Sequence, residues 1–372
     1  MTFSKIYKVG LVGCGGMGRH HLNILNQLPE FSITALCDIS PDTLKKVGSE
    51  YNVSELYQDF NEMYDKVQLD FVIVATQTRG HHAPTVSALS RGISVICEKP
   101  IAIDLVEADD MVNTATKYGA KLAINQQNHV NPGIRKAQAM VKDGAIGEVI
   151  LIRGRNKHGR KSGNEFMEMG THITDMMLCF GGVPKWCSGT IYYEGKLAGP
   201  EDIMEAKEMS PNDRDSGLVM GSRAIANYGF ERACFGEIHF LGYKQGMSAN
   251  YGVDILGEKG QLAVRCTGGL KENLWHLPRP MEGTPAQLSD WKLVDLSDIE
   301  IQDPIITMYR MFVQAIENDT DPPSSGEEAR WAFEMIMGIY KSHIEGGRRV
   351  NLPLADRKHP LEQWLRLEKD NK

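Results

Sequence analysis

The sequence has few cysteines, no long apolar segment and no excess of basic residues. Its seven cysteines stand singly, without a C-x-x-C pair, and such an odd, dispersed set favours reduced thiols in a cytosol over a disulfide framework. No apolar run approaches the roughly 18 residues that a membrane helix needs. Residues 1–5 are too short and polar for a signal peptide. We therefore expect a soluble, cytoplasmic protein.

The charge balance and the absence of repeats exclude further classes. The formal net charge is −7 and the isoelectric point is near 5.9, which provides no electrostatic footprint for nucleic acid or an anionic membrane. The sequence contains neither an internal repeat nor a low-complexity tract. With 42% hydrophobic and 24% charged residues, the chain is typical of a globular protein, and its 372 residues indicate two domains.

A glycine-rich loop near the start of the chain is the strongest local signal. The loop 13–18 follows a short apolar run and precedes a helical stretch. Gly13, Gly15 and Gly18 make the G-x-G-x-x-G pattern in the context where it binds a dinucleotide. The first glycine permits the turn, the second lets the backbone approach a pyrophosphate, and the third lets the helix pack on the strand. The N–H groups at the helix start then face the phosphates.

A second apolar run, residues 33–37, ends at Asp38, 20 residues after Gly18. An acidic residue at this distance accepts hydrogen bonds from both adenosine ribose hydroxyls of NAD and repels the 2′-phosphate of NADP. No arginine follows at Ile39 or Ser40 to offset the charge. The sequence therefore predicts NAD as the cofactor.

The order of strand and helix signals predicts an α/β chain with two domains. Residues 1–124 alternate apolar strands with helices, which is typical of a doubly wound parallel sheet, so we expect an NAD-binding Rossmann domain there. Residues 125–372 are richer in strands with apolar–polar alternation, which indicates a substrate-binding and oligomerisation α+β domain on a large, mainly antiparallel open sheet. Its expected strands are 148–153, 186–194, 221–230, 234–241, 252–256 and 260–265. Its expected later helices are 168–180, 307–318 and 326–345. The segment 196–216 is expected to be a long loop.

Two groups of residues could perform chemistry. Lys99 ends a parallel strand, where doubly wound sheets bind ligands, and is either a general acid or base or an ordinary solvated lysine. Glu168, His172 and Asp175 would share one face of a helix and present an oriented imidazole to a substrate hydroxyl; the alternative is a capped core helix. His158 could join Glu168 and His172 around a metal, but the spacing is not that of a zinc site, so we predict no metal.

Four motifs together resemble the glucose–fructose oxidoreductase / inositol dehydrogenase (Gfo/Idh/MocA) family. They are the loop 13–18, Glu98-Lys99-Pro100, Gly144-Ala145-Ile146-Gly147-Glu148, and Gly170-Thr171-His172 with Asp175. The resemblance spans most of the chain. It implies a dinucleotide-dependent oxidoreductase of sugars, cyclitols or glycosides that forms a homo-oligomer, a dimer or tetramer. Lys99 and His172 correspond to the family's lysine and histidine that flank the reacting carbon. Glu168 stands where the family often has aspartate.

The resemblance also extends the set of expected ligand contacts. The turn from Thr76 to His81 resembles the family's turn toward the nicotinamide, with Gln77 in place of a proline. Expected cofactor contacts are Gly13, Gly15, Gly16, Met17, Gly18, Asp38, Ile39, Thr76, Gln77, His81, Glu98, Lys99 and Gln127. Expected substrate contacts are Glu168, Asp175 and the basic-loop residues Arg155, Lys157 and His158, although this basic loop could equally be a solvated surface.

The leading hypothesis is NAD-dependent oxidation of a secondary hydroxyl of a sugar or glycoside, and the type that forms a 3-keto-glycoside is one form of it. Lys99, helped by His172, would take the hydroxyl proton. The alternatives are an inositol dehydrogenase, a redox-assisted glycoside cleavage that recycles NAD, and a non-catalytic NAD sensor, which would need neither residue. An open sheet with an apolar exposed face predicts that another subunit covers it.

Overall fold

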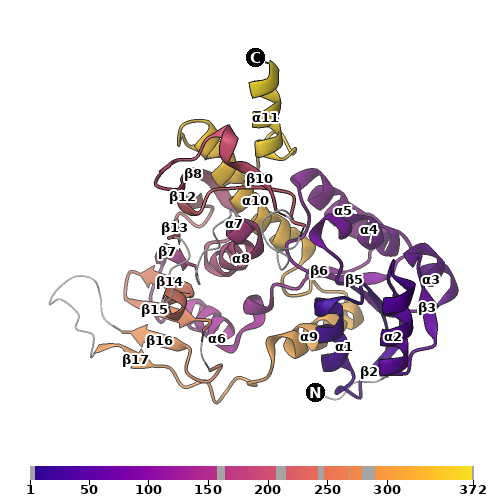
Figure 1. Cartoon of the computed structure of the whole chain (residues 1–372). Coiled ribbons are helices and arrows are strands. Elements are labelled where there is room, and N and C mark those ends of the chain that lie inside the picture. Colours follow the sequence, from indigo (N-terminus) through magenta and orange to yellow (C-terminus); the bar gives the residue numbers. More distant parts are fainter. Residues whose placement is uncertain are drawn as a thin grey trace. The chain divides into compact units, whose positions relative to one another are not determined.

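The computed structural model describes residues 5–156, 164–206, 215–241, 247–267, 269–278 and 290–370. The chain forms two compact units, residues 1–125 with 309–330, and residues 126–308 with 331–372 (Figure 1). The first crossing between the units follows Asn125, one residue beyond the expected domain end. The return of residues 309–330 to the first unit was not predicted from the sequence. No helix of the described residues is long and apolar enough to cross a membrane.

The first unit is built on a six-stranded parallel sheet with the strand order β3-β2-β1-β4-β5-β6. Its strands β1, β4 and β5 consist almost entirely of buried residues, as expected where helices cover both faces of a parallel sheet. The elements are β1 (Tyr7–Val12), α1 (Gly16–Leu25), β2 (Phe31–Cys37), α2 (Pro41–Tyr51), β3 (Glu55–Tyr57), α3 (Phe60–Lys66), β4 (Phe71–Val74), η1 (Thr78–Gly80), α4 (His82–Ser90), β5 (Ser94–Cys97), α5 (Leu105–Tyr118) and β6 (Leu122–Ile124).

The strand order reverses between β1 and β4, so the carboxyl ends of these two strands border the crevice where open α/β sheets bind ligands. Both strands end directly before segments that the sequence analysis singled out. The loop 13–18 follows β1, and the turn that begins at Thr76 follows β4. The predicted Rossmann arrangement is confirmed.

Aromatic packing explains why residues 309–330 join the first unit. The ring of Phe312, in helix α9 (Pro304–Asn318), lies 5.5 Å from the ring of Phe71 in β4, centroid to centroid. The ring of Tyr309 lies 5.8 Å from that of Phe31 in β2. The helix thus buries its apolar side against the parallel sheet, a long-range contact that no local sequence pattern contains.

The second unit contains a sheet of ten strands within the described residues, in the order β17-β16-β15-β14-β7-β13-β12-β8-β18, with β9 paired to β8. Its described strand pairs are antiparallel except for β7 with β13. The strands are β7 (Val149–Arg155), β8 (Pro184–Tyr193), β9 (Lys196–Leu197), β12 (Arg223–Phe230), β13 (Phe235–Phe240), β14 (Gly252–Gly257), β15 (Gly260–Arg265), β16 (Leu274–Leu277), β17 (Lys292–Leu293) and β18 (Val350–Asn351), and a separate pair is β10 (Ile203–Glu205) with β11 (Leu218–Met220).

Helices cover one face of this sheet. The helices and turns that complete the second unit are η2 (Gln127–Val130), α6 (Pro132–Lys142), α7 (Asn164–Glu168), α8 (Gly170–Gly181), η3 (Pro200–Asp202), η5 (Met247–Asn250), most of α10 (Gly326–Ile344) and α11 (Pro360–Asp370). A Cβ atom on Gly154 would meet Ile173 and Met177 of α8, at 2.5 and 2.8 Å, so the helix lies directly on β7. The hydroxyl of Tyr228 in β12 donates to the carbonyl oxygen of Met335 in α10.

Two expectations for the second unit differ from the structure. The helix expected over 168–180 is two helices, because α7 ends at Glu168 and α8 begins at Gly170. Gly170 lies too close to its neighbours for a side chain, since a Cβ atom there would be 2.9 Å from both Ile336 and Phe240. The segment 196–216 is not simply a loop, because its described part contains β9, η3 and β10.

Candidate active site

The glycine loop adopts the geometry that its pattern predicts. Gly13 has a φ of +96°, and a Cβ atom there would lie 2.7 Å from the carbonyl carbon and oxygen of Ala75. A Cβ atom on Gly18 would lie 1.9 Å from the carbonyl oxygen of Gly13, so only glycine allows α1 to pack this closely on the loop. By contrast, a Cβ atom on Gly15 or Gly16 would meet no described atom within 4 Å. The N-terminus of α1 is therefore open to a ligand.

Asp38 is held beside this loop by two backbone hydrogen bonds. Its Oδ2 accepts from the N–H of Cys14 at 2.7 Å, and its Oδ1 accepts from the N–H of Ser40 at 2.9 Å. The next side chain, Ile39, is 90% exposed, so an apolar surface lies beside the carboxylate. A helix N-terminus open to an anion, with a fixed carboxylate at the end of the next strand, fits the pyrophosphate and ribose of a dinucleotide.

Lys99 follows β5, next to a buried hydrogen-bond network. The neighbouring Glu98 is 1% exposed. Its Oε1 accepts from the side-chain amide of Asn125 at 2.7 Å and lies 2.9 Å from Nε2 of His21. Nδ1 of His21 lies 2.5 Å from the hydroxyl of Tyr309. Glu98, one of the expected cofactor contacts, is thus buried and anchors the backbone that carries Lys99.

The sequence alone did not point to His21 and Tyr309, the other members of this network. His21 could have been found as a polar residue on the buried side of α1, because a buried polar side chain needs a hydrogen-bond partner. His81, also an expected cofactor contact, lies against two backbone carbonyl groups of the first unit. It is fully buried, with Nδ1 2.9 Å from the carbonyl oxygen of Pro100 and Nε2 3.3 Å from that of Thr76. Thr76 is half-buried and Gln77 is exposed beside it.

Helix α8 carries His172 and Asp175 in the second unit. His172 is 4% exposed, and the carboxylate of Asp175 is fully buried. Glu168 belongs to α7 and does not continue the face of α8, so the three residues do not lie along one helix. Its Oε1 accepts a hydrogen bond from the hydroxyl of Ser216 at 3.0 Å, and both side chains are buried.

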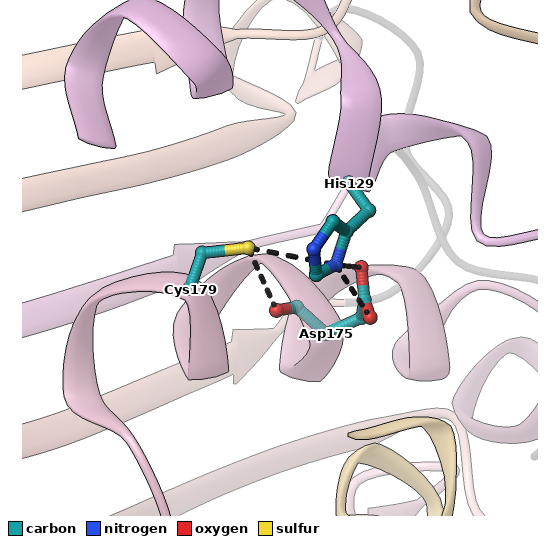
Figure 2. A group of neighbouring side chains, drawn as sticks. All are labelled: His129, Asp175 and Cys179. Atoms are coloured by element: carbon teal, nitrogen blue, oxygen red, sulfur yellow. Dashed lines mark hydrogen bonds and ion pairs between the residues drawn. The ribbon is translucent and has the colours of Figure 1, made fainter. Parts of the chain in front are cut away.

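Asp175 lies against a histidine that the sequence analysis did not single out. Nδ1 of His129, in η2, is 3.2 Å from each carboxylate oxygen of Asp175 and 3.7 Å from Sγ of Cys179 (Figure 2). Burial lowers the pKa of His129, but Cys179 and Asp175 outweigh burial and hold that pKa well above its usual range. The residues of this cluster come from η2 and from two successive turns of α8.

The predicted substrate residues of the basic loop lie apart from α8 or outside the described residues. Successive side chains of a strand point to opposite faces, and Gly154 faces α8, so Arg155 points to the other face of the sheet. There its Nε donates to Oδ2 of Asp254 at 2.7 Å. Lys157 and His158 lie outside the described residues. Gln127, an expected cofactor contact, begins η2 in the second unit and is half-buried.

Two curated relatives align with more than nine-tenths of the chain. Over 371 aligned residues the chain is 25% identical to D-apiose dehydrogenase of Paraburkholderia graminis, covering 96% of this chain and 93% of the relative. It is also 25% identical to myo-inositol 2-dehydrogenase of Thermotoga maritima, covering 93% of this chain and 98% of the relative. Both relatives therefore correspond to the two units together.

Solved structures show the same fold. Levoglucosan dehydrogenase, in complex with NADH and levoglucosan, superposes with a TM-score of 0.75 at 16% identity and covers 94% of this chain and 100% of that chain. The WlbA dehydrogenase from Bordetella pertussis, in complex with NADH and UDP-GlcNAcA, has a TM-score of 0.69 at 17% identity, with coverages of 94% and 100%. The predicted combination of a Rossmann domain and an open-sheet domain is confirmed.

A family model matches the N-terminal, cofactor-binding segment of the chain. Residues 7–126 match the family model GFO_IDH_MocA, an oxidoreductase family with an NAD-binding Rossmann fold. The matched segment includes the glycine loop, Asp38, and the Glu98-Lys99-Pro100 motif, whose geometry is described above. The predicted cofactor, NAD, and the predicted reaction class, oxidoreduction, are confirmed by this match and by the relatives. Residues 7–126 therefore form an NAD-binding Rossmann domain of the Gfo/Idh/MocA oxidoreductase family.

Proposed function

We propose that the protein oxidises a secondary hydroxyl of a sugar, glycoside or cyclitol with NAD. The observation that carries the cofactor part is the carboxylate of Asp38, fixed by the N–H groups of Cys14 and Ser40 beside the open N-terminus of α1. The substrate class is supported by the curated relatives, which are dehydrogenases of apiose and of myo-inositol. Both compounds are polyhydroxylated and carry secondary hydroxyls.

Separate groups of the first unit would hold the parts of NAD. The N–H groups at the start of α1 would bind the pyrophosphate, and Gly15 and Gly16 leave room for it. Asp38 would accept from the adenosine ribose hydroxyls, and the exposed side chain of Ile39 would cover a face of the adenine. Thr76 and Gln77, at the end of β4, would contact the nicotinamide half. Bound NAD supplies the acceptor for the hydride that leaves the carbinol carbon.

Lys99 and His172 would handle the proton of the reacting hydroxyl. The support for this pairing is the motif resemblance, which matches both residues to the family's lysine and histidine beside the reacting carbon. In the oxidation direction Lys99 takes the hydroxyl proton as the hydride departs, and His172 donates a hydrogen bond to the same oxygen. Glu98, buried and bonded to Asn125 and His21, would hold the backbone at Lys99 in place and is thus a positioning residue.

One assay tests this function against its alternatives. The purified protein is incubated with NAD and a panel of aldoses, inositols, 1,6-anhydrosugars and glycosides, and both NADH and the released sugar are measured. Net NADH formation with at least one polyol or sugar supports the dehydrogenase. Release of the sugar from a glycoside without net NADH would show redox-assisted cleavage in place of the dehydrogenase reaction. Binding of NAD without either product would favour the sensor.

We also propose a homo-oligomer, a dimer or tetramer, and a cytoplasmic location. The open face of the large sheet exposes Tyr192, Ile225 and Phe235 on three neighbouring strands, which supports coverage by a second subunit. The seven cysteines, all within the described residues, form no disulfide with one another, as expected in a reducing compartment. Cell fractionation with an antibody against the chain tests the location.

A further inference from the structure

We propose that His129, Asp175 and Cys179 form a binding site for a Zn²⁺ ion, with the imidazole Nδ1, a carboxylate oxygen and the thiolate Sγ as ligands. The donor atoms lie within 4.8 Å of one another. Within the described ranges, this is the one group of three histidine, cysteine or acidic side chains that are so close. Figure 2 shows the imidazole of His129 pointing at the thiol and the carboxylate that α8 presents to it.

Two of the three distances between the donor atoms are close to those that a tetrahedral zinc requires. With ordinary zinc–ligand bond lengths and tetrahedral angles, a ligating nitrogen lies about 3.6 Å from a ligating sulfur and about 3.4 Å from a ligating oxygen. Nδ1 of His129 lies 3.7 Å from Sγ of Cys179 and 3.2 Å from each carboxylate oxygen of Asp175. These two distances would change by only a few tenths of an ångström around an ion, and the third pair, Sγ of Cys179 and the carboxylate of Asp175, lies within 4.8 Å.

Two packed helices position these donor atoms. Asp175 and Cys179 are four residues apart on α8, so they occupy the same face on successive turns. His129 comes from η2, which packs against α8. The donor types also select the metal, because a thiolate with an imidazole suits zinc and other late transition metals, whereas magnesium and calcium prefer oxygen ligands alone.

An activated cysteine is the main alternative for these three residue types, and the geometry disfavours it. In a cysteine–histidine–carboxylate nucleophile, the thiol and the carboxylate use different ring nitrogens, so that the carboxylate orients the imidazole. Here both Cys179 and Asp175 approach the same nitrogen, Nδ1 of His129. A thiol and a carboxylate that both approach one imidazole nitrogen are grouped as the ligands of one ion are.

Three protein ligands leave a fourth zinc position for water or another exchangeable ligand. Access is available because the His129 side chain is 12% exposed and Cys179 is half-buried, whereas Asp175 is fully buried. The ion would bind the same helix that carries His172, three residues before Asp175. Zinc would therefore tie the later turns of α8 to η2, and we expect it to raise the midpoint of thermal unfolding.

Cobalt substitution tests the site directly. The full-length protein is treated with a chelator, passed through a desalting column and titrated with Co²⁺. We expect one cobalt per chain, a thiolate-to-cobalt charge-transfer absorption in the near ultraviolet, and loss of that absorption when Zn²⁺ is added. Cys179→Ser should abolish the charge-transfer band, and His129→Ala should abolish stoichiometric binding. The matched control is Cys266→Ser, which removes another half-buried thiol of the same unit and should leave the band unchanged.

Two results would overturn the proposal. One is a wild-type protein without the charge-transfer band, and the other is a band that survives in Cys179→Ser. Circular dichroism establishes whether each variant is folded, and if a variant is not, the wild-type spectrum decides alone. The cobalt titration does not measure turnover or NAD binding, so its failure is distinguishable from failure of the proposed dehydrogenase.

Discussion

Lys99 follows a glutamate that scarcely reaches solvent. At 1% exposure, Glu98 satisfies its carboxylate with Asn125 and His21 inside the first unit. A buried carboxylate with two polar partners fixes the backbone because the loss of a partner leaves the group less well compensated in a medium of low dielectric. Adjacent residues of one motif thus have different tasks in the proposed mechanism: Glu98 holds the strand end, and Lys99 would act on the substrate.

Substitution of the two proposed catalytic residues should affect turnover far more than cofactor binding. Loss of a general acid or base costs on the order of a hundred- to ten-thousandfold in rate, so Lys99→Ala and His172→Ala should each lower kcat by about that amount. Both variants should bind NAD with near wild-type affinity in calorimetry, because the loop 13–18 and Asp38 would hold the pyrophosphate and the adenosine ribose. Lys45→Ala, at an exposed lysine of α2, serves as the control. Near-normal turnover of Lys99→Ala would refute the mechanism.

Asp38 should set both the affinity for NAD and the preference over NADP. A hydrogen bond to a charged group contributes about 1.5–3 kcal/mol, so Asp38→Ala should raise the Kd for NAD by about ten- to a hundredfold. Its kcat at saturating NAD should stay near that of the wild type. Asp42→Ala removes an exposed carboxylate from the start of α2 and should leave the Kd unchanged. Tighter binding of NADP than of NAD to the wild type, measured by calorimetry, would contradict this role.

At the scale of elements, glycines decide how closely helices approach strands. Gly154 lets α8 lie on β7, and Gly170 lets the same helix begin against Phe240. Gly18 does so for α1 and the cofactor loop. In each case a Cβ atom would overlap its neighbour, so these contacts could not form with a larger residue unless the helix moved.

The start of α11 contains a histidine whose burial makes stability depend on pH. His359 is 5% exposed, its ring centroid lies 5.7 Å from that of Tyr340, and its Nδ1 accepts the N–H of Leu361 at 3.2 Å. Burial lowers the pKa of His359 to about 4, against 6.5 for an ordinary histidine. Above pH 6.5 the ring is neutral in both states, so its full contribution to stability is present. Below that pH the unfolded chain gains a proton that the folded chain gains only near pH 4, so stability is lost as the pH falls from 6.5 to 4.

This shift corresponds to about 2 kcal/mol of unfolding free energy lost by pH 5 relative to pH 7. Urea unfolding of the wild type and of His359→Gln at the two pH values measures it. The variant should lose less stability between pH 7 and pH 5, by about that amount. Because other histidines also titrate here, only the difference between the two proteins reports on His359. Equal losses in both would show that burial of this ring does not shift its pKa.

At the scale of the whole molecule, the open sheet face is the feature that calls for a partner. It combines the exposed apolar side chains Tyr192, Ile225 and Phe235 with ion pairs such as that between Arg155 and Asp254. The sequence predicted a largely apolar face, whereas the structure shows apolar and charged side chains together. Such a mixture is typical of protein interfaces, which are no more apolar as a whole than the rest of the surface.

We expect the wild type to be a dimer or tetramer in light scattering at micromolar concentration. Ile225→Glu places a charge in the middle of this face and should shift the mass toward the monomer. Leu367→Glu, at an exposed leucine of α11, is the matched control and should leave the mass unchanged. A monomeric wild type at this concentration would contradict the expected assembly.

The sequence by itself determined the parts of the fold that depend on local patterns. Gly13, Gly15 and Gly18 predicted the strand, turn and helix because each glycine answers a backbone requirement within a few residues. The apolar runs predicted the parallel sheet because buried strands need continuous apolar sequence. The alternation beyond residue 125 predicted most strands of the open sheet, because one covered face imposes a period of two.

Only the tertiary structure decided which distant residues meet. Residues 309–330 join the first unit through Phe312 and Tyr309, and no local pattern encodes a contact with strands more than 200 residues earlier. Arg155 faces away from α8 because the register of β7 assigns it to the other side of the sheet. The convergence of His129 with Cys179, 50 residues later, also depends on packing between elements. Local patterns determine single elements, whereas long-range packing determines their neighbours.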